Sequence, residues 1–317
     1  MQQEDGKDRA EQEDVARYIA LLDKIRDAFR IKILYGRTAR AVIIKDYPYS
    51  PRDRSEENPR ATEKITQIIA AGEKDYAALL QSFTDYAPFF EKIPLTGDEN
   101  TRDPFWLDNR IGALDGLSLY GLIAQRQPDI YMEIGSGNAT KFARRAIEDH
   151  GLKTKIISID PFPRAEIDAL CDEIIRAPLE ECDPAIFNRL KAGDMLFVAG
   201  GSHRAFPNSD VTVFFTEVLP LLKKDVIYGL RDIFLPRDYP AAWKKRFYNE
   251  QYLLHAYLLG GAGGDKILLP CLYTAAATDS ADTVDAFRAL FTHGTLRELA
   301  ETKPQYTGGA CFWMKKS

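Results

Sequence analysis

Short runs of β-branched residues alternate with helical patterns along the last two thirds of the chain, and this alternation limits the possible folds more than any other feature. The runs, which we expect to be strands, are Ile130 to Ile134, Lys155 to Ile159, Glu173 to Arg176, Met195 to Val198, Val226 to Leu230, Lys266 to Leu269 and Ala310 to Met314. Helical stretches lie between them, among them 141–149, 164–171, 210–222 and 248–259. Strands alternating with helices are typical of βαβ units, so we expect an α/β fold with a mostly parallel sheet.

The first hundred residues have a different character. Residues 1–14 are almost all charged or amide residues and predict a disordered tail. Apolar residues recur every three or four positions from Val15 to Ile33, and a second amphipathic stretch runs from Ala61 to Phe90, so both predict helices. We expect the apolar face of these helices to cover the rest of the protein or a second subunit of a homo-oligomer. The expected parts are a tail (1–14), a helical N-terminal extension (15–100) and one larger domain (101–317).

Composition excludes several classes of protein. The 317 residues contain 42 Lys and Arg against 47 Asp and Glu, a net charge of −5, without the basic surplus of nucleic-acid binders. No run approaches the roughly 18 apolar residues of a membrane span, and the charged N-terminus lacks the apolar core of a secretory signal. The four cysteines show no Cys-x-x-Cys spacing, which favours free thiols. We therefore expect a cytoplasmic protein that acts on a small molecule, with no nucleic-acid or membrane partner.

The first expected strand leads directly into a Gly-x-Gly turn, Gly135-Ser136-Gly137, and a helical pattern follows at once. Such a turn lets the backbone approach a nucleotide-like ligand closely. Glu133, just before the turn, would repel a pyrophosphate but suits a ligand that carries an ammonium and a sulfonium. Thr140 stands where the dinucleotide fingerprint has its third glycine. The segment therefore indicates S-adenosylmethionine rather than NAD.

The next expected strand ends in Asp160. A carboxylate at this position can accept hydrogen bonds from both hydroxyls of an adenosine ribose. We therefore expect Asp160 to lie in the same cofactor site as the Gly-x-Gly turn.

From about residue 104 to 314 the chain resembles the class I S-adenosylmethionine-dependent methyltransferases. Glu133 to Gly137 is similar to the cofactor-binding turn of that family, and Ser158 to Asp160 to its ribose-binding strand end. The segments that resemble a bacterial small-molecule subgroup are 197–203, 232–240, 246–252 and 308–313. The resemblance implies a doubly wound, Rossmann-like sheet of seven strands in the order 3-2-1-4-5-7-6, with the last strand antiparallel.

Two positions depart from the subgroup. Ala199 stands where an Asp is common after the fourth strand, and Arg231 stands where a His precedes Asp232. Related catechol-type enzymes hold a divalent metal with acidic residues at these strand ends, and such a cation needs several oxygen ligands. With Ala199 in place of a carboxylate, we expect no metal site.

Two candidate catalytic residues follow the fourth and fifth strands. His203 is the candidate base, needed if the acceptor must lose a proton, and Asp232 is the candidate carboxylate that orients the acceptor or serves as a second base. Both are expected at the carboxyl edge of the sheet, where open α/β folds bind ligands. Purely local roles remain open, since His203 could hydrogen-bond within its turn and Asp232 could cap the following segment.

The sequence therefore predicts an S-adenosylmethionine-dependent methyltransferase that acts on an oxygen or nitrogen of a small molecule. The expected cofactor contacts are Glu133, Gly135, Ser136, Gly137 and Asp160. Two alternatives stay open: a protein that binds the cofactor without catalysis, which Ala199 and Arg231 would suit, and an NAD-dependent oxidoreductase. A further segment, Trp106 to Asn109, either helps to close the pocket or only packs at the sheet edge.

Overall fold

The computed structural model describes residues 60–98, 100–244, 246–276 and 278–317, together with residues 17, 20–21, 32–35 and 41–44. The chain divides into two compact units, Met1–Arg52 with Ala241–Phe247, and Asp53–Pro240 with Tyr248–Ser317. In the described part of the smaller unit, β1 (Lys32–Tyr35) pairs antiparallel with β2 (Ala41–Ile44), and α11 (Ala241–Lys244) is a short helix.

One expectation for the N-terminal region was wrong. Ile33 lies in β1, opposite Ile43, so the helical pattern that starts at Val15 does not continue to its expected end. The two paired segments are rich in β-branched residues, which favour extended backbone over helix. Arg17, Ala20 and Leu21 are helical, as expected. The expected tail, 1–14, lies outside the described residues.

The larger unit is built on a sheet of seven strands in the order β5-β4-β3-β6-β7-β9-β8. Strand β9 is antiparallel to both of its neighbours, and every other neighbouring pair is parallel. Counted from β3, this is the predicted order 3-2-1-4-5-7-6, so the expected doubly wound α/β fold is confirmed. The strands are β3 (Ile130–Ile134), β4 (Lys155–Ile159), β5 (Glu173–Ile175), β6 (Met195–Val198), β7 (Ile227–Leu230), β8 (Lys266–Pro270) and β9 (Phe312–Lys315).

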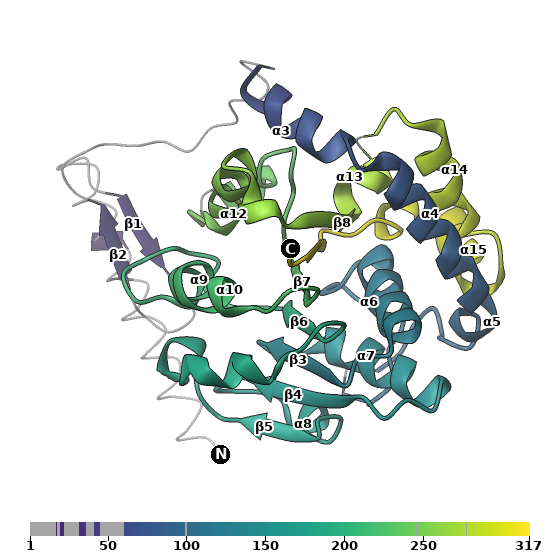
Figure 1. Ribbon diagram of the computed structural model, residues 1–317, viewed down its shortest axis with the longest axis horizontal. Coiled ribbons are helices and arrows are strands. Elements are labelled where there is room, and N and C mark those ends of the chain that lie inside the picture. The colour runs from purple at the N-terminus through teal and green to yellow at the C-terminus, as the bar shows by residue number, and fades with distance from the viewer. Residues whose placement is uncertain are drawn as a thin grey trace. The chain divides into compact units, whose positions relative to one another are not determined.

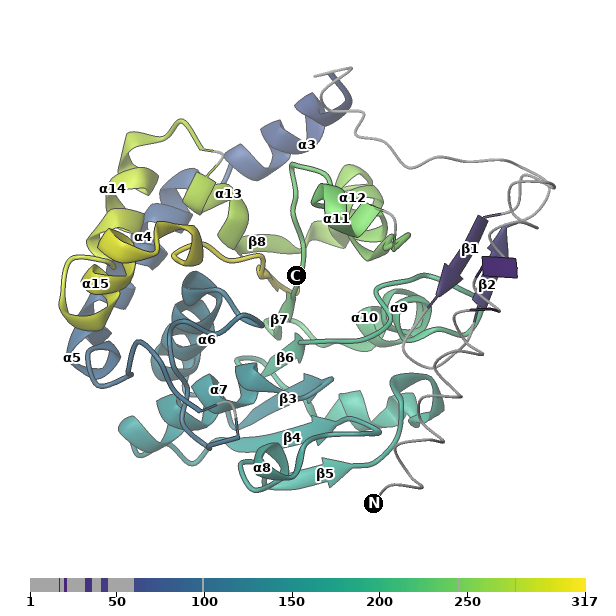
Figure 2. The same ribbon diagram turned by 180° about the vertical axis from the view of Figure 1, so that it is seen from behind.

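Helices lie on both sides of this sheet, with α6 and α7 on one side and α9 and α10 on the other (Figures 1 and 2). The expected helix at 164–171 is only the short α8, whereas the other three expected helices are confirmed with small shifts at their ends. No helix in the described ranges has the length and apolar character needed to cross a membrane. The helices that cover the sheet are α6 (Ala113–Arg126), α7 (Asn138–Asp149), α8 (Ala165–Asp168), α9 (Asp210–Val213), α10 (Leu219–Leu221) and α12 (Glu250–Leu259).

The second amphipathic stretch forms three helices, α3 (Arg60–Ala70), α4 (Glu73–Phe83) and α5 (Ala87–Phe90). Their buried side chains, such as Ile65 and Phe83, belong to the same hydrophobic core as the sheet. Three later helices complete this side of the unit, and α14 packs along α4 (Figure 1). The later helices are α13 (Cys271–Ala276), α14 (Ala281–Ala289) and α15 (Gly294–Thr302).

A glycine in the middle of the sheet allows two large aromatic rings to meet. Gly229 of β7 is paired with Phe197 of β6 on one side and with Trp313 of β9 on the other. The rings of Phe197 and Trp313 stack with their centroids 4.9 Å apart. A Cβ on Gly229 would lie 2.5 Å from the Trp313 ring and 2.9 Å from the Phe197 ring, so the stack spans the strand only because this residue has no side chain.

The parallel strands β3, β4, β6 and β7 bring their carboxyl ends to one edge of the sheet. The turns that follow them carry Gly135, Asp160, Ala199 and Asp232 in that order. Ligands of open α/β folds bind at this edge, so the sequence candidates lie where such a site is expected.

Candidate functional site

The turn after β3 packs directly against the turn after β6. Gly135 has a φ of +75°, and its amide donates to the carbonyl oxygen of Ile159 at 2.9 Å. The amide of Ala199 donates to the carbonyl oxygen of Ile134 at 2.9 Å. A Cβ on Gly135 would lie 2.7 Å from the carbonyl oxygen of Gly200. Both the backbone angle and the close approach therefore require glycine at position 135.

The second glycine of the Gly-x-Gly turn, Gly137, lies just before α7 and has different surroundings. The amide of Gly137 donates to Oγ1 of Thr140 at 3.0 Å, which satisfies one of the free amides of the helix N-terminus. No described atom lies within 4 Å of a Cβ built on Gly137. The space above Gly137 is therefore open, whereas the space beside Gly135 is filled by protein.

Glu133 lies beneath this turn and is completely buried. Its Oε2 accepts a hydrogen bond of 2.5 Å from the hydroxyl of Thr140. Within the described part of the chain, neither its Oε1 nor the hydroxyl of Tyr131 has a hydrogen-bond partner. Burial raises the pKa of Glu133 to about 8, although the Thr140 hydrogen bond and the charge of Arg231 act in the opposite direction.

Asp160 follows β4 and is partly exposed at the neighbouring position of the same edge. Its Oδ1 accepts a hydrogen bond of 2.7 Å from the amide of Phe162, and the Phe162 ring is 90% exposed. The hydroxyls of Ser136 and Ser158 lie 2.5 Å apart and join the turn after β3 to strand β4. A carboxylate and an exposed aromatic ring are thus presented together beside the Gly-x-Gly turn.

A chain of polar side chains joins this region to the segment before α6. Arg164 donates to Oδ1 of Asn138, the first residue of α7, and the Asn138 amide donates to Asp108. Trp106 is buried, with its ring 5.4 Å from that of Phe142, so the packing alternative describes this residue. Asp108, two residues later, is the member of the segment that reaches the first residue of α7, next to the Gly-x-Gly turn.

The two catalytic candidates, His203 and Asp232, are brought together. Nε2 of His203 lies 3.6 Å from Oδ2 of Asp232, which is too far for a hydrogen bond but close enough for a strong charge interaction. Both residues have a positive φ, 54° and 63° respectively. Nε and Nη2 of Arg231 each lie 3.2 Å from Oδ2 of Asp232. Asp232 therefore lies between a histidine and a half-buried arginine.

The structure adds one residue that the sequence interpretation did not select. Nδ1 of His203 lies 2.8 Å from Oε2 of Glu250, the first residue of α12, and the Glu250 side chain is only 5% exposed. Glu250 lies in the segment 246–252, which resembles the family subgroup, but no spacing rule links residues 47 positions apart. Only the tertiary structure identifies Glu250 as part of the site.

His203 and Glu250 each shift the pKa of the other. Burial lowers the pKa of His203, but the hydrogen bond and charge of Glu250 and the charge of Asp232 outweigh burial and raise the pKa above its ordinary value. Burial raises the pKa of Glu250, and the contact with His203 counteracts part of that effect. Titratable groups that are perturbed by burial and by a specific charge partner are enriched at functional sites.

The strand end after β6 offers no carboxylate that could hold a metal ion. Ala199 is buried and supplies only its backbone, and no group of three or more His, Cys, Asp or Glu residues in the described ranges could hold a metal ion. The described residues at this edge therefore do not fit a divalent cation, which needs several oxygen ligands.

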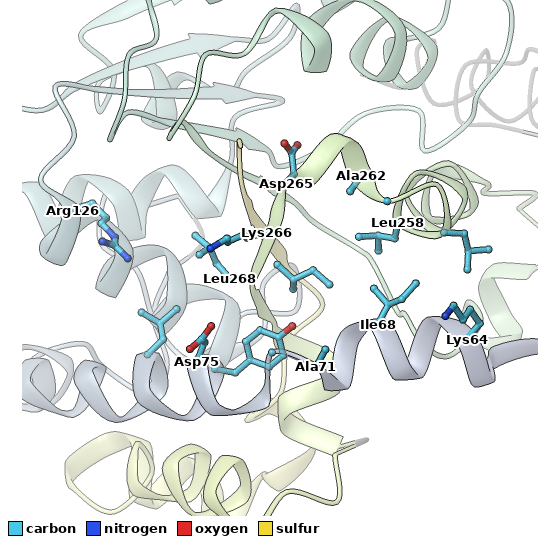
Figure 3. Close-up of a pocket in the computed structure, with 16 residues that line it drawn as sticks. Lys64, Ile68, Ala71, Asp75, Arg126, Leu258, Ala262, Asp265, Lys266 and Leu268 are labelled. Carbon is cyan, nitrogen blue, oxygen red and sulfur yellow. The ribbon is translucent and has the colours of Figure 1, made fainter.

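A pocket of ≈ 680 Å³ lies elsewhere, beside the edge strand β8 (Figure 3). Its lining includes Lys64 and Ile68 of α3, Arg126 at the end of α6, and Lys266 and Leu268 of β8. Lys266 and Leu268 belong to the amino-terminal half of β8, and Arg126 lies at the end of the helix that precedes β3. The pocket therefore opens toward the opposite end of the strands from Asp160 and Asp232. It is separate from the candidate site.

No protein-family model matches the chain, and no curated protein matches it significantly. Among solved structures it is similar to the SAH-bound methyltransferase PaMTH1 of Podospora anserina, with 14% identity, 80% of this chain and 96% of that chain covered, and a TM-score of 0.37. It is also similar to a putative methyltransferase of Thermobifida fusca YX, with 15% identity, coverage of 77% and 94%, and a TM-score of 0.35. Cofactor-bound Rv0187 from MTB matches with 14% identity, coverage of 76% and 88%, and a TM-score of 0.31.

Proposed function

We propose that this protein is an S-adenosylmethionine-dependent methyltransferase that moves a methyl group to an oxygen or nitrogen of a small-molecule acceptor. The observation that carries the proposal is the arrangement at the carboxyl edge of the sheet. An open Gly137, the required Gly135 and the strand-ending Asp160 lie on neighbouring turns, next to the paired His203 and Asp232. The order of the sheet, with β9 antiparallel, agrees with this reading.

The residues present fit this cofactor better than a dinucleotide. Asp160 would hold the ribose hydroxyls, the exposed Phe162 ring offers an apolar face for the adenine, and the open Gly137 lets the chain come close to the ligand. Thr140 uses its hydroxyl to hold Glu133, so a carboxyl group lies beneath the turn where a pyrophosphate would have to bind. Although burial raises the pKa of this group to about 8, a nearby cation would favour its ionised form and a pyrophosphate would oppose it, so the group favours a cationic ligand.

S-adenosylmethionine supplies a methyl group on a positively charged sulfur. A lone pair of the acceptor attacks the methyl carbon, and the sulfur is the leaving group. In this displacement the new bond forms between the acceptor atom and the methyl carbon, and the electron pair of the broken carbon–sulfur bond stays on sulfur. The protein must align the acceptor, and such alignment supplies a large part of the rate enhancement. Asp232, fixed by Arg231, would orient the acceptor through a hydrogen bond.

His203 would take the proton that a hydroxyl acceptor releases when it is methylated. A base in contact with a buried carboxylate is useful for a neutral hydroxyl and less so for a neutral amine, whose lone pair can attack without losing a proton first. Within the proposed function, this favours oxygen over nitrogen as the acceptor atom.

Isothermal titration of the full chain with S-adenosylmethionine, S-adenosylhomocysteine and NAD tests the proposal. We expect binding of the first two and none of NAD, and Asp160→Ala should weaken S-adenosylmethionine binding about 10- to 100-fold, as expected for the loss of hydrogen bonds to a charged group. Asp129→Ala is the matched control, because Asp129 is an exposed aspartate at the amino end of β3. Preferential binding of NAD, or equal binding by Asp160→Ala, would contradict the proposal.

Cofactor binding without catalysis is the remaining alternative. It predicts normal titrations but no transfer of a labelled methyl group to any member of a broad panel of alcohols, phenols, sugars and amines. Transfer to one member would exclude this alternative. The paired His203 and Glu250 speak against it, because a buried acid–base pair is costly to maintain without use.

A further inference from the structure

Two separate contacts connect His203 to the start of α12. The side chain meets Oε2 of Glu250 through Nδ1 at 2.8 Å. The backbone carbonyl oxygen of His203 accepts hydrogen bonds from the amides of Asn249 at 2.9 Å and Glu250 at 3.3 Å. The turn and the helix start are therefore fixed to each other through both backbone and side chain.

The neighbouring residues hold this arrangement further. Oδ1 of Asn249 accepts a hydrogen bond of 2.6 Å from the amide of Ala205, and the Tyr248 ring lies 4.8 Å from the His203 ring. The guanidinium of Arg204 lies 4.8 Å from the centre of the Tyr248 ring. The imidazole thus has contacts on its Nδ1 edge and on its face, while Nε2 is directed toward Asp232.

We propose that Glu250 is a positioning residue, whose buried carboxylate accepts the Nδ1 proton of His203 and so makes Nε2 the ring nitrogen that receives the proton of the acceptor. An ionised carboxylate can only accept, so the neutral imidazole must carry its hydrogen on Nδ1. The second ring nitrogen is then free of hydrogen and faces the side of Asp232. This role rests on the proposed function, because the proton comes from a methyl acceptor.

The charges around the imidazole favour this assignment. Glu250 of α12 and Asp232 after β7 stabilise the protonated ring, and Arg231 opposes them. Asp210 of α9 adds negative charge near Glu250. After His203 accepts a proton, the ring is therefore held between two carboxylates, and the positive charge that develops on it is compensated.

Nitrogen-15 NMR of the full chain labelled at histidine tests the assignment without any turnover. The sequence has only four histidines, so the His203 signals can be assigned by comparison with one His203 variant. We expect the neutral ring to be protonated at Nδ1 and to titrate above the ordinary histidine pKa. A neutral ring protonated at Nε2 would overturn the proposal, and this measurement needs no variant of Glu250.

Variants of Glu250 supply the second measurement. Glu250→Gln should lower the His203 pKa by about one to three units, because it removes an adjacent opposite charge, and Glu250→Asp should restore part of the shift. Asp265→Asn is the matched control, since Asp265 is another buried carboxylate but accepts its hydrogen bonds from Tyr228 and Tyr257. An unchanged His203 titration in Glu250→Gln would overturn the proposal.

The two proposals can fail separately. If the wild-type protein did not bind S-adenosylmethionine in the titration, the methyltransferase function would be wrong whatever the NMR result. If the cofactor bound and the His203 tautomer or titration differed from expectation, only the role of Glu250 would be wrong. With an acceptor in hand, Glu250→Gln should also shift the acid limb of the pH–kcat profile to lower pH, which a purely structural role would not do.

Discussion

The hydroxyl of Thr140 donates a 2.5 Å hydrogen bond to the buried carboxyl group of Glu133 and at the same time accepts one from the amide of Gly137. Thr140 occupies the position where a dinucleotide-binding turn has a glycine for close packing of helix on strand. Here the position joins a strand, a turn and a helix through one side chain. At position 140 the packing of helix on strand therefore depends on a hydroxyl instead of on the absence of a side chain.

Replacing Thr140 by Val should destabilise the protein. The variant has nearly the same shape but leaves Oε2 of Glu133 and the Gly137 amide without their partner, which should cost about 1–3 kcal/mol of unfolding free energy. Thr140→Ser, which keeps the hydroxyl, is the control. Urea denaturation at pH 7 measures both, and equal stability of Thr140→Val and the wild type would show that this hydrogen bond is unimportant.

Glu133 should make stability depend on pH. Its folded pKa of about 8 lies above the ordinary value of 4.5, so the folded state holds a proton that the unfolded state loses first. Its stabilising contribution is full below pH 4.5 and is lost as the pH rises toward 8, by about 1.4 kcal/mol per pH unit. His203 and Glu250 change stability in the same direction, so the contribution of Glu133 is read from a comparison with Glu133→Gln.

In denaturant titrations between pH 5 and 8, the stability advantage of Glu133→Gln over the wild type should grow with pH. A difference between the two proteins that stays constant across this range would contradict the assigned protonation of Glu133. S-adenosylmethionine should reduce the slope of the wild type, because a cation near the turn favours the ionised carboxylate.

Gly137→Ala should separate binding from stability. Its φ of −176° suits any residue and no described atom lies near the new methyl group, so the unfolding free energy should fall by at most about 1 kcal/mol, the difference between Gly and Ala at a helix N-terminus. The methyl group would occupy the open space where we propose that the cofactor lies. We expect at least a tenfold loss of S-adenosylmethionine affinity by titration calorimetry, and unchanged affinity would show that the ligand does not approach this glycine.

Gly229→Ala should disturb the centre of the sheet. The new methyl group would meet the rings of Trp313 and Phe197 at 2.5 and 2.9 Å, and overpacking of this kind costs about 1–3 kcal/mol. Gly308→Ala is the control, because the nearest atom to its Cβ, in Ala275, is 3.9 Å away. Thermal and urea denaturation of the two variants should differ clearly, and similar stabilities would mean that the ring stack adjusts at little cost.

The strands and the order of the sheet could be predicted because they depend on local features. Buried parallel strands are continuous apolar runs, and the turns after β3 and β4 carry their own markers in Gly135 and Asp160. Helix α6 was not predicted, and its burial explains why. Every residue from Ala113 to Ala124 is buried, so this helix has no polar face and shows no amphipathic period.

The polar contacts across the site could not be predicted for a related reason. His203 and Glu250 lie on different elements, and their contact depends on how α12 packs against the turn after β6. The carboxylate of Asp115 in α6 likewise binds the amides of Ala310 and Cys311 just before β9. The residue types at the strand ends indicate the chemistry, whereas the partners that tune them come from distant parts of the chain.

The position of β9 has a consequence for the order in which the protein can form during synthesis. Residues 312–315 are the last strand of the sheet to leave the ribosome, yet they lie between β7 and β8, which were made much earlier. Until they arrive, β7 has an open edge and β8 has no partner, so these two strands are exposed to incorrect pairing. The segment that carries Arg231 and Asp232 therefore gains its final support only when translation of this region is complete.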